Sequence, residues 1–204
     1  ALAAVLLSPF LPLLFMGEEY GETAPFQYFI EHGDPDLIEA VRQGRRREFA
    51  AFGWKAEEIP DPQDEATFLR SKLTRERMDP RRQGLLRWTR ALTRLRQTVP
   101  SLGVGDGLRT HHSVLGLETE QVLLLHRWVD GGERALVILG FNEAPVRLTL
   151  CEPVGIWQLR LDSASGEFGG SGSPAVEPQL LIRAEGTTVS LPSYAACVLL
   201  FSHA

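Results

Sequence analysis

Residues 11–21 read LPLLFMGEEYG, an apolar run that ends in two glutamates, a tyrosine and a glycine. The apolar part, residues 11–16, has the length and composition of a short strand covered on both faces, as in a parallel sheet. Polar side chains then follow at the carboxyl end of this strand, where a (β/α)8 barrel builds its active site. A turn with two solvated glutamates explains the local pattern equally well.

Two helices are expected between this strand and residue 100. Asp34-Pro35 supplies a helix cap and a proline at the first helical position, and Asp79-Pro80 opens a second helix in the same way. Pro100 ends the second helix. Its apolar side chains recur at steps of three and four residues, so one face must pack on a larger body. They are Leu85, Trp88, Leu92, Leu95 and Val99.

After residue 100 the sequence changes to short runs rich in Val, Leu and Ile, separated by turn residues about every 8 to 12 positions. The candidate strands are residues 114–119, 122–128, 135–141, 146–150, 156–161, 180–184, 188–191 and 197–202. This pattern predicts an antiparallel β-sandwich. We therefore expect two parts, residues 1–100 with the α/β elements and residues 101–204 with the sandwich.

Charge and hydropathy limit the classes of function. The 204 residues hold 21 Lys and Arg against 26 Asp and Glu. An acidic surface repels phosphates, and the basic stretch 70–96 coincides with the amphipathic helix, so we expect no nucleic-acid partner. The apolar residues 1–16 follow no basic segment and are interrupted by Ser8, Pro9 and Pro12. We therefore expect neither a membrane span nor a secretion signal.

Two cysteines, Cys151 and Cys197, are too few for a disulfide framework, so we expect free buried thiols and a cytoplasmic protein. The histidines show no Cys/His spacing typical of a zinc site, so we expect no metal and no cofactor. Because the chain has no initiating Met and opens within an apolar segment, we expect it to be one piece of a longer protein.

The run from Pro12 to Gly21 resembles the eighth barrel strand and loop of the alpha-amylase superfamily. A narrower resemblance, to maltooligosyltrehalose trehalohydrolases, rests on PFQYF at residues 25–29 with His32, and on IPDPQD leading to FLRSKL within residues 59–73. The last helix and the sandwich ending in LPSY at 191–194 also resemble that superfamily. The resemblance covers nearly the whole chain. It implies the last strand and helices of a (β/α)8 barrel, followed by an antiparallel β-sandwich.

For a full-length enzyme the resemblance implies retaining hydrolysis of the α-1,4 bond next to a terminal trehalose in a maltooligosyl chain. Three carboxylates carry such chemistry: a nucleophile, a proton donor and an acid that binds the sugar. In the superfamily they follow the fourth, fifth and seventh barrel strands, which places them upstream of Ala1. We therefore assign no catalytic residue, and we expect the chain to be inactive without the amino-terminal barrel portion.

The candidates for substrate contact are Glu18, Glu19, Phe26, Gln27, Tyr28 and His32. Glu19 is expected to orient the site, with Glu18 facing sugar or solvent. Neighbours on an extended chain point to opposite sides, so these glutamates should not form an acid pair. The aromatic side chains could stack on glucose rings, with Gln27 and His32 as hydroxyl partners, although plain loop packing is a close alternative.

Two other patterns favour structural roles. Asp162 completes an Arg-x-Asp sequence like the nucleophile motif of the superfamily, but it lacks the motif's flanking Gly and His and lies in the predicted sandwich. The tryptophans at 54, 88, 128 and 157 are expected in the core.

Two alternative classes stay open. A branching enzyme or another glucan transferase shares the eighth-strand motif with a hydrolase and differs in the access of water. A carbohydrate-binding or purely stabilising β module would need the sandwich alone, and we expect little glucan retention by residues 101–204.

Overall fold

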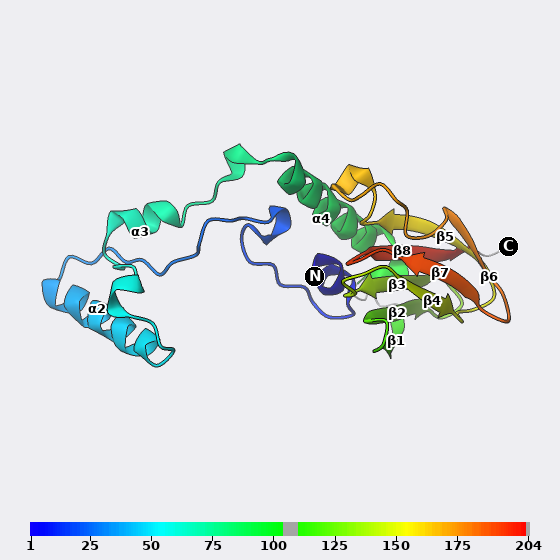
Figure 1. The fold of residues 1–204 in the computed structure, drawn as a ribbon, viewed down its shortest axis with the longest axis horizontal. Coiled ribbons are helices and arrows are strands. Elements are labelled where there is room, and N and C mark those ends of the chain that lie inside the picture. Colours follow the sequence, from blue (N-terminus) through cyan, green and yellow to red (C-terminus); the bar gives the residue numbers. More distant parts are fainter. Residues whose placement is uncertain (104–109, 203–204) are drawn as a thin grey trace. The chain divides into compact units, whose positions relative to one another are not determined.

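The computed structural model describes residues 1–103 and 110–202 (Figure 1). Their contacts form two compact units: one comprises Ala1–Gly21 with Asp79–Ala204, and the other comprises Glu22–Met78. The division at residue 100 that the sequence suggests does not coincide with these units. That division refers to the barrel of the superfamily, and it stays a proposal.

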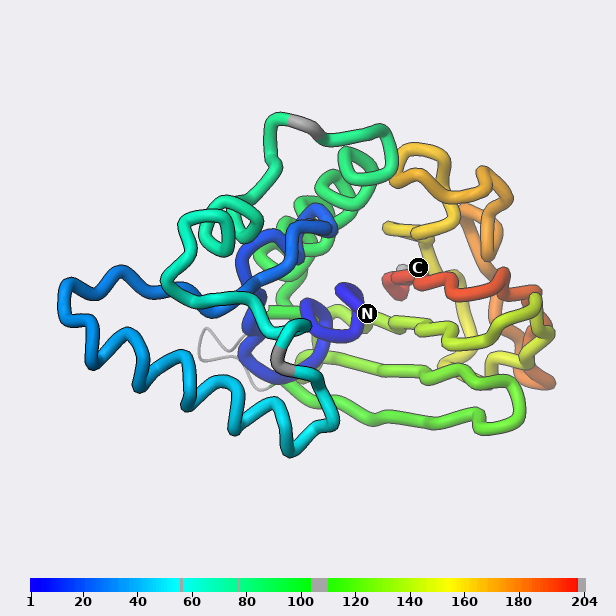
Figure 2. Tube along the Cα trace, turned by 60° about the vertical axis from the view of Figure 1, so that its left-hand side comes forward, coloured from blue at the N-terminus to red at the C-terminus, as the bar shows by residue number. Residues whose placement is uncertain are grey.

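The larger unit contains two antiparallel sheets. The six-stranded sheet has the order β1 (Thr110–Leu117), β2 (Val122–Val129), β3 (Arg134–Gly140), β8 (Ala196–Ser202), β5 (Gly155–Asp162), β6 (Gln179–Ile182). The two-stranded sheet pairs β4 (Val146–Leu150) with β7 (Thr187–Leu191). The hairpin of β1 and β2, drawn in green in Figure 2, lies at one edge of the large sheet. Each predicted strand after residue 100 is confirmed, with ends that shift by a few residues.

The six-stranded sheet is buried on both faces at its centre, as β3 illustrates, whereas the edge strand β1 has no buried residue. Successive strand residues point to opposite faces. Leu136 and Ile138 belong to the core that also contains the side chains of β4 and β7. Ala135 and Val137 belong to a second core, which contains the helical side chains. The unit is therefore a sandwich with a helical layer on its other face.

The helical layer consists mainly of α4 (Pro80–Thr98) and α1 (Leu2–Leu7), with the 3-10 turns η1 (Glu18–Tyr20), η4 (Pro100–Leu102) and η5 (Gly166–Phe168). Asp79 caps α4 by accepting the amide of Arg82 at 2.8 Å, which confirms the predicted helix start. Trp88 and Leu92 are buried with sheet residues in the second core. Each such side chain contributes about 1.5 to 3 kcal/mol by leaving water.

Residues 11–16 were expected to form a buried strand, and this expectation is wrong for the structure. The segment has no regular secondary structure, and Leu11 and Leu13 are 83% and 88% exposed. A strand needs partners for its backbone N–H and C=O groups, and the described residues provide no neighbouring strand here.

The smaller unit contains α2 (Pro35–Ala50), α3 (Glu65–Arg70) and the 3-10 turns η2 (Ala56–Glu58) and η3 (Arg75–Arg77). Asp34 caps α2 as predicted, accepting the amide of Asp36 at 2.9 Å. None of the residues of α2, all of which the structure describes, is buried. The two ends of the unit meet where the Glu22 carboxylate accepts the amide and the hydroxyl of Thr74, at 2.6 and 2.9 Å. Polar contacts therefore hold much of this unit together.

Two expectations about burial need correction. Trp157 and Trp88 are buried, but Trp128 is only half-buried, and Trp54 is 50% exposed because it follows α2, which has no buried residue. Cys197 is a buried free thiol, whereas Cys151 is free but exposed, because it lies in the turn after β4. Within the described residues, every helix is too short or too polar to span a lipid bilayer.

Candidate functional site

The loop at residues 17–21 carries the two candidate glutamates on the turn η1. Gly17 and Gly21 flank this turn with backbone φ angles of 92° and 69°, which residues other than glycine rarely adopt. A Glu18 carboxylate oxygen accepts the amide of Phe15 at 2.9 Å, and a Glu19 carboxylate oxygen accepts the amide of Gly17 at 2.8 Å. Both carboxylates are thus bound to the backbone of their own loop.

The expectation of an extended backbone at Glu18 and Glu19 is wrong. A 3-10 helix has about three residues per turn, so consecutive side chains point in different directions by about 120°. Glu18 is exposed and Glu19 is half-buried, while Tyr20 is buried beneath the Arg82 guanidinium, 4.9 Å from its ring centre. The loop is therefore anchored through Tyr20 and presents its two acids at different depths.

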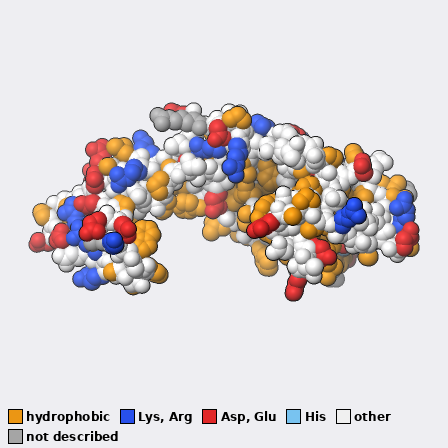
Figure 3. Space-filling view, viewed as in Figure 1, with side chains coloured by type: hydrophobic (Ala, Val, Ile, Leu, Met, Phe, Trp, Pro, Cys, Tyr) orange, Lys and Arg blue, Asp and Glu red, His pale blue; other side chains and the backbone are white. Residues whose placement is uncertain are grey.

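The PFQYF segment presents aromatic side chains outward. Phe26 and Tyr28 are 62% and 49% exposed. Gln27, between them, is tied to α3: its amide donates to the Ser71 hydroxyl at 3.1 Å, and its side-chain oxygen accepts from Arg70 at 3.3 Å. Both rings are thus partly exposed at the surface of the smaller unit, where hydrophobic side chains lie among charged ones (Figure 3).

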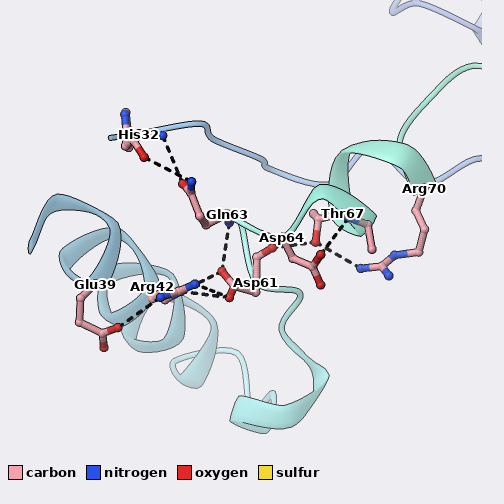
Figure 4. A network of polar contacts seen from close by, with 9 residues as sticks. His32, Glu39, Arg42, Asp61, Gln63, Asp64, Thr67 and Arg70 are labelled. Carbon is pink, nitrogen blue, oxygen red and sulfur yellow. Dashed lines mark hydrogen bonds and ion pairs between the residues drawn. The ribbon is translucent and has the colours of Figure 1, made fainter. Parts of the chain in front are cut away.

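His32 is joined to the second motif through its main chain. Its amide donates to the side-chain oxygen of Gln63 at 3.2 Å, and its carbonyl accepts from the side-chain nitrogen of Gln63 at 3.3 Å (Figure 4). Ile30 adds a backbone bond to the carbonyl of Pro62 at 2.7 Å. These bonds involve only main-chain atoms of His32, so its half-buried imidazole takes no part in them.

Asp61 is a central residue of this network, and the sequence alone assigned it no role. Arg42 donates to its carboxylate through Nε at 3.0 Å and through a terminal nitrogen at 2.8 Å (Figure 4). These hydrogen bonds lower the pKa of Asp61 and raise the pKa of Arg42. Asp61 also accepts the Gln63 amide at 3.0 Å, and its carbonyl accepts the Thr67 hydroxyl at 2.7 Å. The carboxylate thereby fixes the residue that holds His32.

The structure divides the six candidate residues between the two units. Glu18 and Glu19 belong to the larger unit. Phe26, Gln27, Tyr28 and His32 belong to the smaller unit, where the polar network fixes the segment that carries them. That all six contact one substrate stays a prediction.

Other acidic and metal-binding possibilities are limited. Asp162 is buried in the sandwich and accepts the amides of Ala164 and Ala175 at 2.8 and 2.7 Å, which agrees with its expected structural role. Among the described residues, no group of three or more His, Cys, Asp or Glu side chains could hold a metal ion. His203 lies outside the described residues.

Comparisons by sequence give a consistent set of relatives, although no protein-family model matches the chain. A malto-oligosyltrehalose trehalohydrolase of Rhizobium sp. (strain M-11) is 37% identical over 202 residues, covering 98% of this chain and 30% of the relative. Proteins with the same name from Arthrobacter ramosus and Deinococcus radiodurans are 48% and 42% identical over 162 and 159 residues. These matches cover 76% and 72% of the chain but 24% and 26% of the relatives. The chain thus spans less than a third of the length of these relatives.

Comparisons by structure agree. A crystal structure of a proposed alpha amylase from Salmonella typhimurium superposes with a TM-score of 0.68 at 30% identity, covering 98% of this chain and 30% of that protein. An isomaltulose synthase from Klebsiella sp. LX3 has a TM-score of 0.58 at 21% identity over 98% of this chain and 37% of its own, a likeness of fold alone. They confirm the predicted fold class, in which the last elements of a barrel precede an antiparallel β-sandwich.

Proposed function

Since this chain is a sequence relative of the malto-oligosyltrehalose trehalohydrolases, in the alpha-amylase superfamily, we propose that it contributes to an enzyme of that activity. The full-length enzyme, of the length of those relatives, hydrolyses the α-1,4 bond next to a terminal trehalose and releases trehalose. The observation that supports this proposal most is the match to the Rhizobium protein, which runs through 98% of the chain and includes both units.

The proposed substrate contacts follow from the chemistry of the exposed side chains. A glucose ring presents apolar C–H faces, which stack on aromatic rings, and a rim of hydroxyls, which exchange hydrogen bonds with polar groups. Phe26 and Tyr28 supply exposed rings, and the imidazole of His32 and the side-chain nitrogen of Gln27 supply polar partners. Glu19 orients the site from its loop.

The catalytic acids of this proposal lie outside the chain. Retaining hydrolysis needs one carboxylate that attacks the anomeric carbon and a second that protonates the leaving oxygen and later takes a proton from water. Glu18 and Glu19 accept backbone amides of their own loop, so we assign neither role to them. We further propose a cytoplasmic location, which the free thiols Cys151 and Cys197 support.

The test is product analysis with maltooligosyltrehalose as substrate. We expect the full-length enzyme to produce trehalose and a maltooligosaccharide shortened by two glucose units, since the bond cleaved lies next to the trehalose. We expect the 204-residue chain alone to give no trehalose above background, because the transition state then lacks its nucleophile and its proton donor. Branched or lengthened glucans as the main product would replace hydrolysis by transfer, and trehalose from the chain alone would refute the assignment of its acids.

A further inference from the structure

Two buried arginines of the larger unit contact the same stretch of backbone. Arg96, on α4, donates to the carbonyl oxygens of Leu6 and Ser8 through one terminal nitrogen and to that of Phe10 through the other. The last two distances are 2.8 and 2.7 Å. These carbonyls lie at the end of α1 and just after it, where a helix leaves its oxygens without intrahelical partners.

Arg127, on β2, contacts the same stretch of backbone from the sheet and shares the carbonyl of Ser8 with Arg96. It donates to the carbonyls of Leu7 at 3.3 Å and Ser8 at 3.4 Å, and also to those of Leu102 at 2.8 Å and Gly103 at 2.9 Å. A side chain of the β-sandwich thus holds backbone that lies about 120 positions earlier in the chain.

Burying these two charged side chains removes them from water, which costs free energy. Arg127 is 2% exposed and Arg96 is 8% exposed. Among the described residues, neither guanidinium forms an ion pair with a carboxylate. Burial, together with the charge of Arg96, lowers the pKa of Arg127 to about 10. A buried charge without a counter-charge is tolerated more easily when its donors find acceptors. Here main-chain oxygens accept from the terminal nitrogens of both guanidinium groups, whereas Nε of Arg127 is buried without a hydrogen-bond partner among the described residues.

The same helix also holds the loop that carries the two glutamates. The Thr89 hydroxyl of α4 lies 2.8 Å from the carbonyl of Glu19, and Arg82 of α4 covers the ring of the buried Tyr20. Residues 11–16, of which Pro12 and Leu14 are half-buried and the others exposed, therefore run between two attachment points on α4, one at Arg96 and one at Thr89. Because α4 packs on the six-stranded sheet, the sheet supports both attachment points.

We propose that Arg127 and Arg96 are positioning residues for the loop of Glu18 and Glu19, and that fixing this loop is a function of the β-sandwich. Arg127 links the sheet directly to the end of α1, and Arg96 links α4 to the backbone from there to Phe10. The loop can then keep one orientation although the segment before it has no regular structure. The link of this loop to catalysis rests on the function proposed above.

Hydrogen exchange of the 204-residue chain tests the positioning. In Arg127→Met we expect the amides of Val5, Ser8 and Glu18, which are hydrogen-bonded in the structure, to exchange faster by about tenfold or more, because each bond to a charged donor contributes that order to the closed state. Amides of β8 should keep their exchange rates. Arg160→Met is the matched control, since Arg160 is an exposed arginine on β5 of the same sheet.

A second variant covers the case in which Arg127→Met unfolds. Arg127→Lys keeps the charge but offers a single ammonium group to four carbonyls, so we expect a smaller acceleration confined to the same amides. Unchanged exchange at residues 5–18 in Arg127→Lys and in any folded Arg127→Met would overturn the proposal, as would equal acceleration in β8.

Kinetics of the full-length enzyme test the connection to the site. We expect Arg127→Lys to lower kcat/KM by about tenfold at a temperature where the protein stays folded, since the loop loses its fixed orientation. Arg160→Met should leave kcat/KM unchanged. If the enzyme releases no trehalose at all, the proposed function fails while the exchange result still decides the positioning. If trehalose is released and kcat/KM is unchanged in Arg127→Lys, the loop does not serve the reaction.

Discussion

Tyr28 exposes about half of its side chain, and the Arg45 guanidinium lies 5.0 Å from the centre of its ring. A ring in this position has apolar area left for a sugar and little role in a core. In the full-length enzyme we expect Tyr28→Ala to lower kcat/KM by about 5- to 30-fold, which corresponds to ~1 to 2 kcal/mol of stacking, and to change the thermal midpoint little. Phe52→Ala removes another exposed ring of the same unit and serves as the control. A large fall in the midpoint with unchanged kinetics would assign Tyr28 to packing.

The lowered pKa of Asp61 leads to a prediction about the stability of the smaller unit at acidic pH. Arg42 lowers its pKa in the folded state, so the ionised carboxylate stabilises the fold above the pKa of about 3.9 that an unfolded Asp has. This stabilisation is lost as the pH falls through the lower pKa of the folded state. We expect Asp61→Asn to speed exchange of the α3 amides at neutral pH, with a difference from the native chain that shrinks toward pH 3 and below.

The matched control for Asp61 is Asp36→Asn, because Asp36 is an exposed carboxylate in the first turn of α2. It should have no comparable effect on α3 at any pH. A difference between Asp61→Asn and the native chain that stays constant down to low pH would show that the carboxylate is not the stabilising group.

At the residue scale, local signals were predictable and distant partners were not. The caps Asp34 and Asp79 act within three residues along the chain, so their sequence context revealed them. Asp61 and Arg42 are 19 positions apart, with the rest of α2 and the turn η2 between them, and nothing in the local pattern pairs them. The turn at Glu18 depends on the backbone angle of Gly17, which an apolar run does not specify.

At the scale of elements, the helix α4 contains a glycine, Gly84, at which the turn η5 approaches too closely to leave room for a side chain. A Cβ atom added at Gly84 would lie 2.6 Å from the carbonyl oxygen of Phe168 in η5. Alanine usually stabilises a helix relative to glycine, but here we expect Gly84→Ala to destabilise the larger unit by about 1 to 3 kcal/mol. The comparison is Gly44→Ala in α2, where a Cβ meets nothing within 4 Å. We expect it to slow exchange of the α2 amides, by about 0.5 to 1 kcal/mol of helix stability.

Thermal unfolding of Gly84→Ala checks the first of these two outcomes, and hydrogen exchange of Gly44→Ala checks the second. A higher midpoint for Gly84→Ala would mean that η5 can move away from α4 without loss.

Element prediction succeeded where a periodic pattern was long. The stripe of α4 and the alternating runs of the sandwich are of this kind, and both are confirmed. The short helices α1 and α3 have six residues each, too few for a helical period to stand out, and neither was predicted. The prediction for residues 11–16 failed for another reason, since apolar composition does not distinguish a strand from a largely exposed segment outside any sheet.

At the scale of the whole molecule, the two units should differ in resistance to proteases. Because α4 packs on the sheet, we expect the protease-resistant core to begin near Asp79, before the sandwich itself. Limited proteolysis of the 204-residue chain should cut first within residues 22–78, where α2 has no buried residue. Mass spectrometry of the surviving fragments locates the cuts. First cleavage near residue 100, with residues 22–78 intact, would contradict this expectation.

Arg96 and Arg127 hold residues 6–10 through hydrogen bonds to main-chain carbonyl oxygens, which every amino acid carries. Such recognition is indifferent to the identity of the side chains that it holds. The exposed Phe10 can therefore be replaced by other residues without loosening the attachment, whereas the two arginines cannot. For an engineer, position 10 is a place to introduce a label or a new surface chemistry while the backbone attachment of this segment stays intact.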